Sequence, residues 1–367
     1  MHSDVAPGKC QPVGRATFEL GVDAYLSGTR VDRFLTRHFR NYSAFRIQRL
    51  VRCGLVLVDE QPAITNTRVF PGQTVRVQLV EPPDKLFAPE CLPLDIVYED
   101  KWLLVVNKPA GVITHPVSDV QSGTLCNALQ FHLDQQGLRR GLLRPGIIHR
   151  LDRMTSGLLV VSKQHLAHRY LSIDFQERRV TKSYLALVSG VVDVDQGTID
   201  AHIGRVPRAD SILMSGDCDS RDAKPATTRF QVRHRWKNAT LLLATPLTGR
   251  LHQVRIHLAY RGHPVVGDAY YAAGGTIRES PQQGPQRAPL KTTRKHSRTE
   301  PGRRTELRHL LHATELAFRH PISREWMTFV APPADDFMSS IMEWTGSAGI
   351  DRQHLVLQGG PSEAAAV

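Results

Sequence analysis

The chain has 367 residues, of which 41% are hydrophobic, and this is enough for two folded domains with solvated tails. Lysine and arginine number 47 against 35 aspartates and glutamates, so the formal charge of +12 predicts a polyanionic partner such as nucleic acid, with a membrane surface as the rival interpretation. No C-x-x-C pair, spanning segment or signal-peptide core is found, so we expect a cytoplasmic protein without structural zinc or disulfides.

The chain begins with a predicted flexible N-terminus, residues 1–22, followed by a small α/β unit over residues 23–82. A first helix in this unit is indicated by an apolar face at positions i, i+3, i+4 and i+8. The members of this face are Val31, Phe34, Leu35 and Phe39. After a second helix, short strands separated by turn residues are expected.

The second predicted helix of this unit carries a basic stripe. Ser43 is placed to cap its N-terminus, and Gly54 lies where such a helix commonly ends. Arg46, Arg49 and Arg52 recur every three residues along it. Two helices and small strands with this stripe resemble the S-four-type RNA-binding domain, named after a small-subunit ribosomal protein. The resemblance implies that Arg46 and Arg49 bind RNA; a solvated basic helix face is the alternative.

After a linker at residues 83–90, a larger domain is expected over residues 91–340. Strands such as residues 103–106 are mixed with helices in no regular alternation, which predicts an α+β domain with a mixed, mostly antiparallel sheet and flanking helices. Residues 274–309 are polar and basic, and we expect a disordered insertion that either contacts RNA or only adds solubility. Residues 341–367 are expected to be a flexible tail.

The most informative segment is the string HRLDRMTSG, which begins at His149. It places one carboxylate, Asp152, in a turn-forming segment between two short apolar runs of strand type. A loop between strands is where a rigid scaffold can present a reactive group. Arg150 and Arg153 flank Asp152 and favour its ionised form. The alternative is a turn aspartate that hydrogen-bonds to the neighbouring hydroxyl groups.

This string resembles the HRLD-x-x-TSG signature of the large pseudouridine synthase family of the RluA type, which modifies uridines in ribosomal and transfer RNA. The resemblance implies the pseudouridine synthase fold, an isomerase that needs no cofactor, and structured RNA as the partner. It also implies that Asp152 is the catalytic carboxylate. Segments similar to the family follow in order across nearly all of residues 95–338.

Two further segments resemble motifs of this family. KSYLALV, residues 182–188, resembles its K-x-Y-x-A-x-V strand, so Tyr184 is expected to lie against the target base. Ordinary half-buried packing is the alternative for a tyrosine in a strand. TGRLHQVRIHL, residues 248–258, resembles the TGR-x-HQ[IV]R-x-HL motif, and the resemblance pairs Arg255 with Asp152.

The TGR segment also has a physical interpretation. A helix after its Thr-Gly turn is expected to carry Arg255 in the second turn, where the guanidinium can bind a carboxylate with two hydrogen bonds; a surface salt bridge is the alternative. His252 and His257 are five positions apart and fall on different helix faces, which argues against a metal site. The residues assigned to substrate binding in this domain are Arg150, Arg153, Arg250 and His252.

The implied reaction breaks the N1–C1′ bond of uridine, turns the uracil and joins C5 to C1′, with loss of one proton. Asp152 either attacks C1′ or takes the C2′ proton to give a glycal. A paired base is out of reach, so the uridine must be flipped out. Arg150 would then fill the vacated space or hold a phosphate, and Tyr184 would act as a base or stack on the uracil.

Two other classes of function stay open at this level. A non-catalytic RNA-binding factor needs only the small basic unit and the basic insertion. A nucleoside-bond hydrolase would use the same carboxylate, but no second carboxylate lies close to Asp152 in sequence. The sequence leaves open whether ribosomal or transfer RNA is modified and at which uridines. We expect a monomer without an obligate protein partner.

Overall fold

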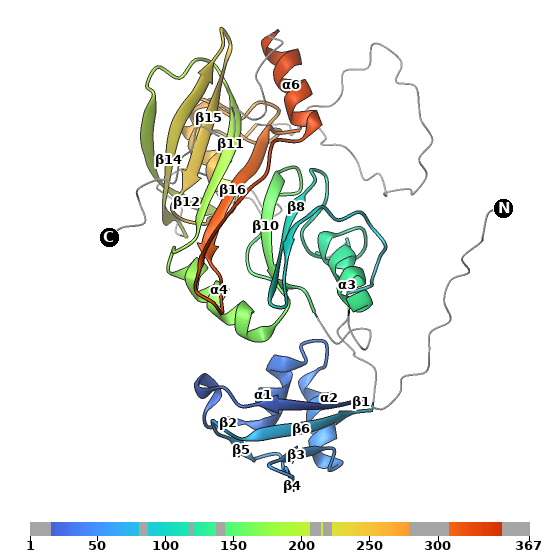
Figure 1. The fold of residues 1–367 in the computed structure, drawn as a ribbon. Coiled ribbons are helices and arrows are strands. Elements are labelled where there is room, and N and C mark those ends of the chain that lie inside the picture. Colours follow the sequence, from blue (N-terminus) through green and yellow to red (C-terminus); the bar gives the residue numbers. More distant parts are fainter. Residues whose placement is uncertain are drawn as a thin grey trace, which may run out of the picture. The chain divides into compact units, whose positions relative to one another are not determined.

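The structure is a computed structural model, and it forms two compact units, one from residues 1–91 and 129–145 and the other from residues 92–128 and 146–367 (Figure 1). No helix within the described ranges is long and apolar enough to cross a membrane. The residues that the structure describes are 16–80, 87–117, 120–136, 144–205, 214–215, 222–278 and 308–346.

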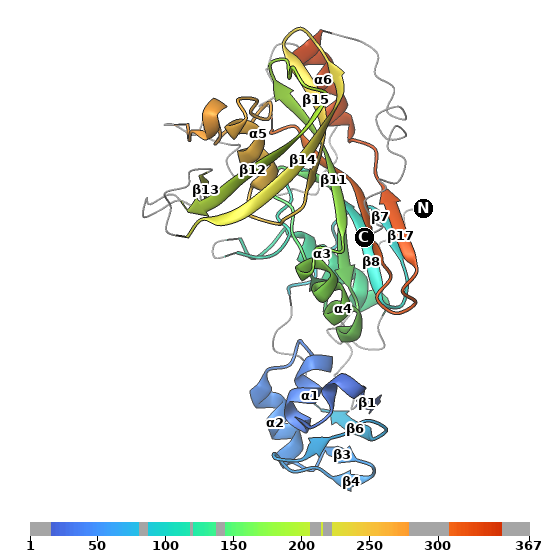
Figure 2. The same cartoon turned by 90° about the vertical axis from the view of Figure 1, so that its left-hand side faces the viewer.

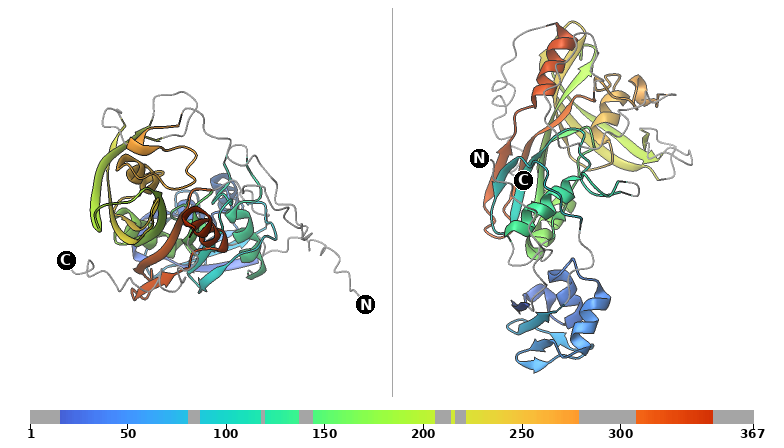
Figure 3. Two further views of the ribbon diagram at one scale, coloured as in Figure 1. Left: turned by 90° about the horizontal axis from the view of Figure 1, so that it is seen from above. Right: turned by 90° about the vertical axis from the view of Figure 1, so that its right-hand side faces the viewer.

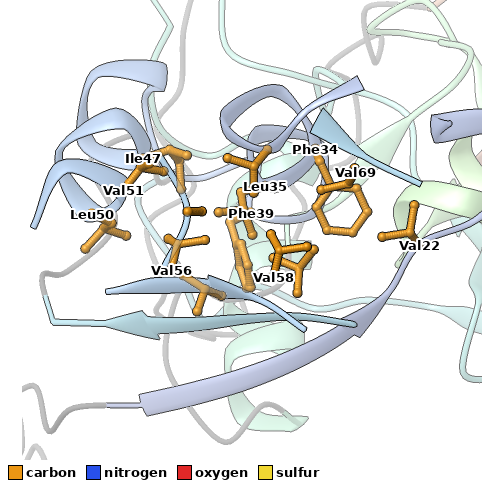
Figure 4. Packing of buried hydrophobic residues seen from close by; sticks show 14 of the residues in the cluster. Val22, Phe34, Leu35, Phe39, Ile47, Leu50, Val51, Val56, Val58 and Val69 are labelled. Carbon is orange, nitrogen blue, oxygen red and sulfur yellow. The ribbon is translucent and has the colours of Figure 1, made fainter. Parts of the chain in front are cut away.

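The smaller unit packs two helices against a four-stranded sheet in the order β1-β6-β3-β4, and a second pair joins β2 to β5. Figure 4 shows the apolar side chains that fill the space between the helices and the sheet. Its elements are β1 (Ala16–Gly21), η1 (Ala24–Leu26), β2 (Thr29–Arg30), α1 (Val31–His38), α2 (Ala44–Arg52), β3 (Val56–Val58), β4 (Gln61–Pro62), β5 (Arg68–Val69) and β6 (Thr74–Leu79).

Local sequence signals account for the two helices of this unit. The predicted apolar face of α1 is buried in the core. The Ser43 hydroxyl accepts a hydrogen bond from the Arg46 amide and caps α2, as predicted. Gly54 follows α2 with φ +71°, a left-handed conformation that glycine adopts without strain. The helix–helix–strand order is therefore as expected, whereas RNA binding by Arg46 and Arg49 stays a prediction.

The larger unit is built on one long sheet in the order β13-β12-β14-β15-β11-β16-β10-β8-β7, with β17 beside β16 and β9 beside β10 (Figures 1 and 2). The pairing of β10 with β16 is parallel, and the other pairings in this sheet are antiparallel. This confirms the predicted α+β class. The strands are β7 (Ile96–Glu99), β8 (Leu103–Lys108), β9 (Gly146–Ile147), β10 (Ser156–Ser162), β11 (Thr181–Ser189), β12 (Gln196–Arg205), β13 (Met214–Ser215), β14 (Lys224–Arg235), β15 (Ala239–Pro246), β16 (Leu311–Arg319) and β17 (Trp326–Val330).

Two helices, α4 and α5, lie against strands of this sheet. α4 contacts β9 and β10, and α5 contacts β12, β14 and β15. Figures 2 and 3 show α5 beside β12 and β14. The helical elements of this unit are α4 (His165–Gln176), α5 (Gln253–Tyr260), η2 (Ala273–Gly275) and α6 (Asp335–Thr345), whereas α3 (Leu125–Gln136) is divided between the two units at residue 129.

The predicted domain limits need four corrections. Residues 16–21 are not a flexible start, because they pair with β6 as strand β1. Residues 341–345 belong to α6, whose apolar residues Phe337 and Ile341 are buried, and so are not part of a tail. The predicted disordered insertion is too long at both ends. Residues 274–278 continue an ordered turn in which the Arg278 amide donates to the Tyr270 carbonyl, and residues 308–309 are buried.

Parts of these predictions lie outside the described residues. Positions 1–15, 279–307 and 347–367 are not described, so the flexible start, the basic insertion and the tail stay predictions there.

Candidate active site

A cleft of about 900 Å³ lies in the larger unit. Asp152 enters it from the loop between β9 and β10, and Tyr184 from β11. The segment that leads into α5 supplies Arg250 and His252, and α5 itself supplies Arg255. Residues separated by about a hundred positions in the chain therefore meet in one cavity. This is the arrangement expected when short loops at the ends of strands build a site.

Asp152 forms an ion pair with Arg255, as predicted. The Arg255 Nη1 donates to Asp152 Oδ2 over 3.0 Å, with 2% of the arginine side chain and 18% of the aspartate side chain exposed. The arginine is thus withdrawn from water while the carboxylate still opens to the cleft. Among the described residues, the predicted neighbours Arg150 and Arg153 form no ion pair with Asp152, so its cationic partner comes from α5.

Arg255 is held from its other side by Asp268, which was not among the predicted site residues. Its Nε and Nη2 donate to the two Asp268 oxygens over 2.7 and 2.8 Å. The Tyr270 and Tyr271 amides donate to Asp268 Oδ1 and fix the carboxylate in turn. Burial works against the charge of Arg255, but these two carboxylates raise its pKa above the ordinary value. Its guanidinium is therefore a permanent cation aimed at Asp152.

His252 lies immediately before α5 in a left-handed conformation, with φ +56°. Its Nδ1 is hydrogen-bonded to the Tyr271 hydroxyl over 2.7 Å, and its Nε2 lies 3.8 Å from Asp152 Oδ1. Burial lowers the pKa of His252, and the Arg255 charge acts in the same direction against the opposing effect of Asp152. His252 is therefore neutral at pH 7. Because α5 begins only at Gln253, Arg255 lies in its first turn, not in the second as predicted.

Tyr184 lines the cleft from β11. Burial and the negative charge of Asp152 both raise its pKa above the ordinary value of a phenol. The side chain is therefore protonated at neutral pH, which disfavours a tyrosinate as general base. The phenol ring and its hydroxyl remain available for contact with a base in the cleft.

Buried polar side chains of His309, His312 and Arg308 hold the segment that follows Asp152 by hydrogen bonds. The Thr155 hydroxyl is hydrogen-bonded to His309 Nε2 over 2.8 Å, and the Ser156 hydroxyl to His312 Nδ1 over 2.9 Å. His312 donates through Nε2 to a backbone carbonyl, so its Nδ1 accepts from Ser156. Arg308 donates to the Met154 carbonyl over 3.0 Å. The serine of the signature therefore attaches the loop to β16, and the threonine attaches it to His309, just before β16.

Lys108, at the end of β8, supports the same loop. Its side chain is fully buried, and Nζ donates to the carbonyls of Pro109, Val112 and Arg153 over 2.8, 2.9 and 3.2 Å. Burial and the nearby Arg308 lower the pKa of Lys108 to about 7, against the opposite effect of Asp152. Three carbonyl acceptors match the three protons of an ammonium group, so the protonated form fits this position.

The remaining predicted site residues divide into three groups. Arg150 and Arg250 line the cleft with Asp152. Arg153 is not among the lining residues, and its Nε donates to the Gly111 carbonyl. Arg46 and Arg49 belong to the smaller unit. Within the described ranges, no group of three or more His, Cys, Asp or Glu side chains is arranged to hold a metal ion.

Comparison with known proteins identifies the family. A family model described as RNA pseudouridylate synthase matches residues 102–260. The uncharacterized RNA pseudouridine synthase YlyB of Bacillus subtilis is 36% identical over 314 residues, which cover 86% of this chain and 93% of the relative. The chain belongs to the RNA pseudouridine synthase family. As such it is an isomerase that acts on RNA.

Other members of the family extend this assignment. The ribosomal large subunit pseudouridine synthase D of Neisseria meningitidis serogroup A is 35% identical over 336 residues, which cover 90% of this chain and 83% of the relative. Human RNA pseudouridylate synthase domain containing 4 has a similar structure, with a TM-score of 0.52 and 26% identity over 67% of this pseudouridine synthase and 91% of the human chain. The larger unit is thus the pseudouridine synthase fold.

Proposed function

We propose that this pseudouridine synthase converts uridines of large-subunit ribosomal RNA to pseudouridine, with Asp152 as the catalytic carboxylate. The observation that carries the proposal is the ion pair of Asp152 with the buried Arg255, at 3.0 Å, in the wall of the cleft. Relatives from Neisseria named for the ribosomal large subunit favour ribosomal over transfer RNA. The predicted monomeric state and cytoplasmic location are compatible with this substrate and remain predictions.

The two oxygens of Asp152 have different surroundings. Oδ2 accepts the hydrogen bond from Arg255, whereas Oδ1 accepts none from the described residues, and the His252 Nε2 lies 3.8 Å from it. Oδ1 is therefore the oxygen that meets the ribose. It either forms a bond to C1′ as the N1–C1′ bond breaks, or takes the C2′ proton to leave a glycal. Both routes use the carboxylate as an anion, and the Arg255 guanidinium is the cation paired with it.

The detached uracil must turn within the cleft before C5 meets C1′. Tyr184 is held as a neutral phenol, so we assign it to contact with the uracil ring and not to proton removal. Arg150 is exposed at the lining of the cleft, next to the catalytic loop. From there it can occupy the space that a flipped uridine leaves in the RNA.

Hydrolysis of the glycosidic bond is the competing chemistry. Hydrolases of this type use two carboxyl groups that flank the bond, about 5–9.5 Å apart. Among the residues that line the cleft, Asp152 is the single carboxylate. Asp268 is fully buried and both its oxygens are bound by Arg255, so it cannot activate water. The site therefore favours isomerisation.

The test is tritium release from RNA that carries tritium at uracil C5. Unmodified transcripts of large-subunit ribosomal RNA and of transfer RNA are incubated with the wild type, with Asp152→Asn and with Asp195→Asn as a matched control. Asp195 is a surface residue, with 88% of its side chain exposed. We expect release from ribosomal RNA by the wild type and the control and none by Asp152→Asn. Release from transfer RNA alone would overturn the substrate assignment, and full activity of Asp152→Asn would overturn the catalytic one.

A further inference from the structure

The cleft continues beyond the reacting groups, toward the C-terminal end of α4. The side chains that line this second part have no role in the chemistry of Asp152. They are Ser172, Phe175, Gln176, Arg178, Val180 and Lys182. A uracil in contact with Tyr184 leaves this part of the cavity empty, which indicates room for another piece of the RNA.

Of the charged residues that line this part of the cleft, Lys182 is the nearest to Tyr184 in sequence. The two residues are separated by one position on β11 and both line the cavity, so they share one face of the strand, about 6.6 Å apart along it. The described residues offer Lys182 no carboxylate and no hydrogen-bond acceptor. Its Nζ instead lies over the Phe175 ring, 5.6 Å from the centroid. Desolvation lowers the pKa of Lys182, as expected for a cation that lacks a counter-ion.

A fixed pair of aromatic rings lies beneath Lys182 in this part of the cleft. Phe175 is stacked on His149, with ring centroids 4.6 Å apart and planes at 24°. The His149 Nε2 accepts the Val160 amide over 3.0 Å, so the ring is neutral and anchored to β10. The Lys182 ammonium group therefore lies over an aromatic pair that is anchored to β10.

The charge of the whole cleft favours an anion at this position. Five of its lining residues are lysine or arginine, and Asp152 is its single carboxylate. Arg255 is already committed to Asp268 and Asp152. Among the other cations, Lys182 makes no ion pair with the described residues and lies between Tyr184 and the Phe175 ring of α4.

We propose that Lys182 binds the phosphodiester group of a nucleotide next to the target uridine, while the uracil lies against Tyr184. This inference rests on RNA being the substrate and adds a positioning contact outside the reacting atoms. A phosphate here would gain a charge-assisted hydrogen bond from the ammonium group in a partly desolvated setting. This contact would also fix the position of the RNA strand along the cleft, so that only one uridine can reach Asp152.

The test compares Lys182→Gln, Lys182→Arg and the control Lys237→Gln, an exposed lysine in the turn between β14 and β15 that lies outside the cleft. Kd for a large-subunit RNA transcript is measured over a series of salt concentrations, alongside KM from tritium release. For Lys182→Gln we expect Kd and KM to rise about tenfold or more. The slope of log Kd against log salt should fall by about 0.7–0.9, the value for one lost phosphate contact. Lys182→Arg should retain the wild-type slope.

Two outcomes would overturn the proposal. One is a Kd and salt slope for Lys182→Gln that match those of Lys237→Gln. The other is an equal loss of affinity in Lys182→Arg and Lys182→Gln, which would assign the side chain to packing. Because binding is measured without turnover, either result is separable from a failure of the wild type to release tritium, which would instead count against the proposed function.

Discussion

Replacing Asp268 with Asn is the sharpest test of how the site is built. The carboxylate accepts four hydrogen bonds, three at Oδ1, from Arg255 and two backbone amides, and one at Oδ2 from the Arg255 Nε. In Asp268→Asn the amide oxygen would take the position with three donors. The amide nitrogen would then face the Nε of Arg255, donor against donor. The shape of the side chain is retained, and only the charge and one acceptor are lost.

The expected loss of stability in Asp268→Asn follows from the burial of the ion pair. The Asp268 side chain is fully buried and only 2% of the Arg255 side chain is exposed. Removing one partner of a buried ion pair costs about 3–5 kcal/mol, and here it leaves the buried Arg255 with Asp152 as its remaining counter-ion. With an m-value of about 3 kcal/mol per M, the urea midpoint should fall by about 1–2 M. Asp152 becomes the only carboxylate bound to Arg255, so the guanidinium moves. A displacement of about 1 Å is enough to lower kcat about 100-fold.

The loss of stability is measured by urea denaturation monitored by circular dichroism, and the loss of kcat is measured by tritium release. The matched control is Asp195→Asn, which breaks the exposed pair with Arg235 at 2.8 Å and should leave both quantities nearly unchanged. If Asp268→Asn unfolds at the wild-type urea concentration and keeps the wild-type kcat, Asp268 does not hold Arg255 in place, and the argument fails.

Three further predictions concern the support of the catalytic loop. Gly157→Ala should cost at least about 3 kcal/mol in urea denaturation, because φ is +115° and a Cβ would overlap the backbone of β16. Lys108→Met should lower kcat by releasing three loop carbonyls, and it should reduce the rise in stability that the wild type shows between pH 7 and about 10, to which the lowered pKa of Lys182 also contributes. Burial lowers the pKa of His149 to about 3, of His312 to about 4, and of His309 well below its ordinary value, so the unfolded chain binds protons that the folded chain does not. Stability should therefore decrease as the pH falls from 6.5 toward 4, by up to about 4 kcal/mol per pH unit.

Each of these has a clear contrary result. Equal urea midpoints for Gly157→Ala and the wild type would contradict the close approach to β16. A Lys108→Met variant with an unchanged pH profile of stability above pH 7 would show that the lysine keeps its ordinary pKa. A flat stability profile between pH 6.5 and 4.5 would show that the three histidines are accessible to protons.

Much of the fold followed from short-range patterns. The apolar spacing of α1, the Ser43 cap of α2 and the branched run that forms β8 each depend on neighbours within a few positions. The family motifs placed Asp152 and Arg255 in the right elements for the same reason. The limits of the disordered insertion were wrong because composition averages over a window, and buried ends such as His309 were counted with their polar neighbours.

The sequence by itself determined the α+β class, and it predicted Asp152 as the reacting carboxylate and Arg255 as its cationic partner. The tertiary structure decided that Asp268 orients Arg255, that His309 holds Thr155 across 154 positions, and that Lys182 has no counter-ion in the cleft. These are contacts between segments far apart in the chain. Their energy depends on burial and on which charges meet, and both quantities exist only after the sheet has brought the loops together.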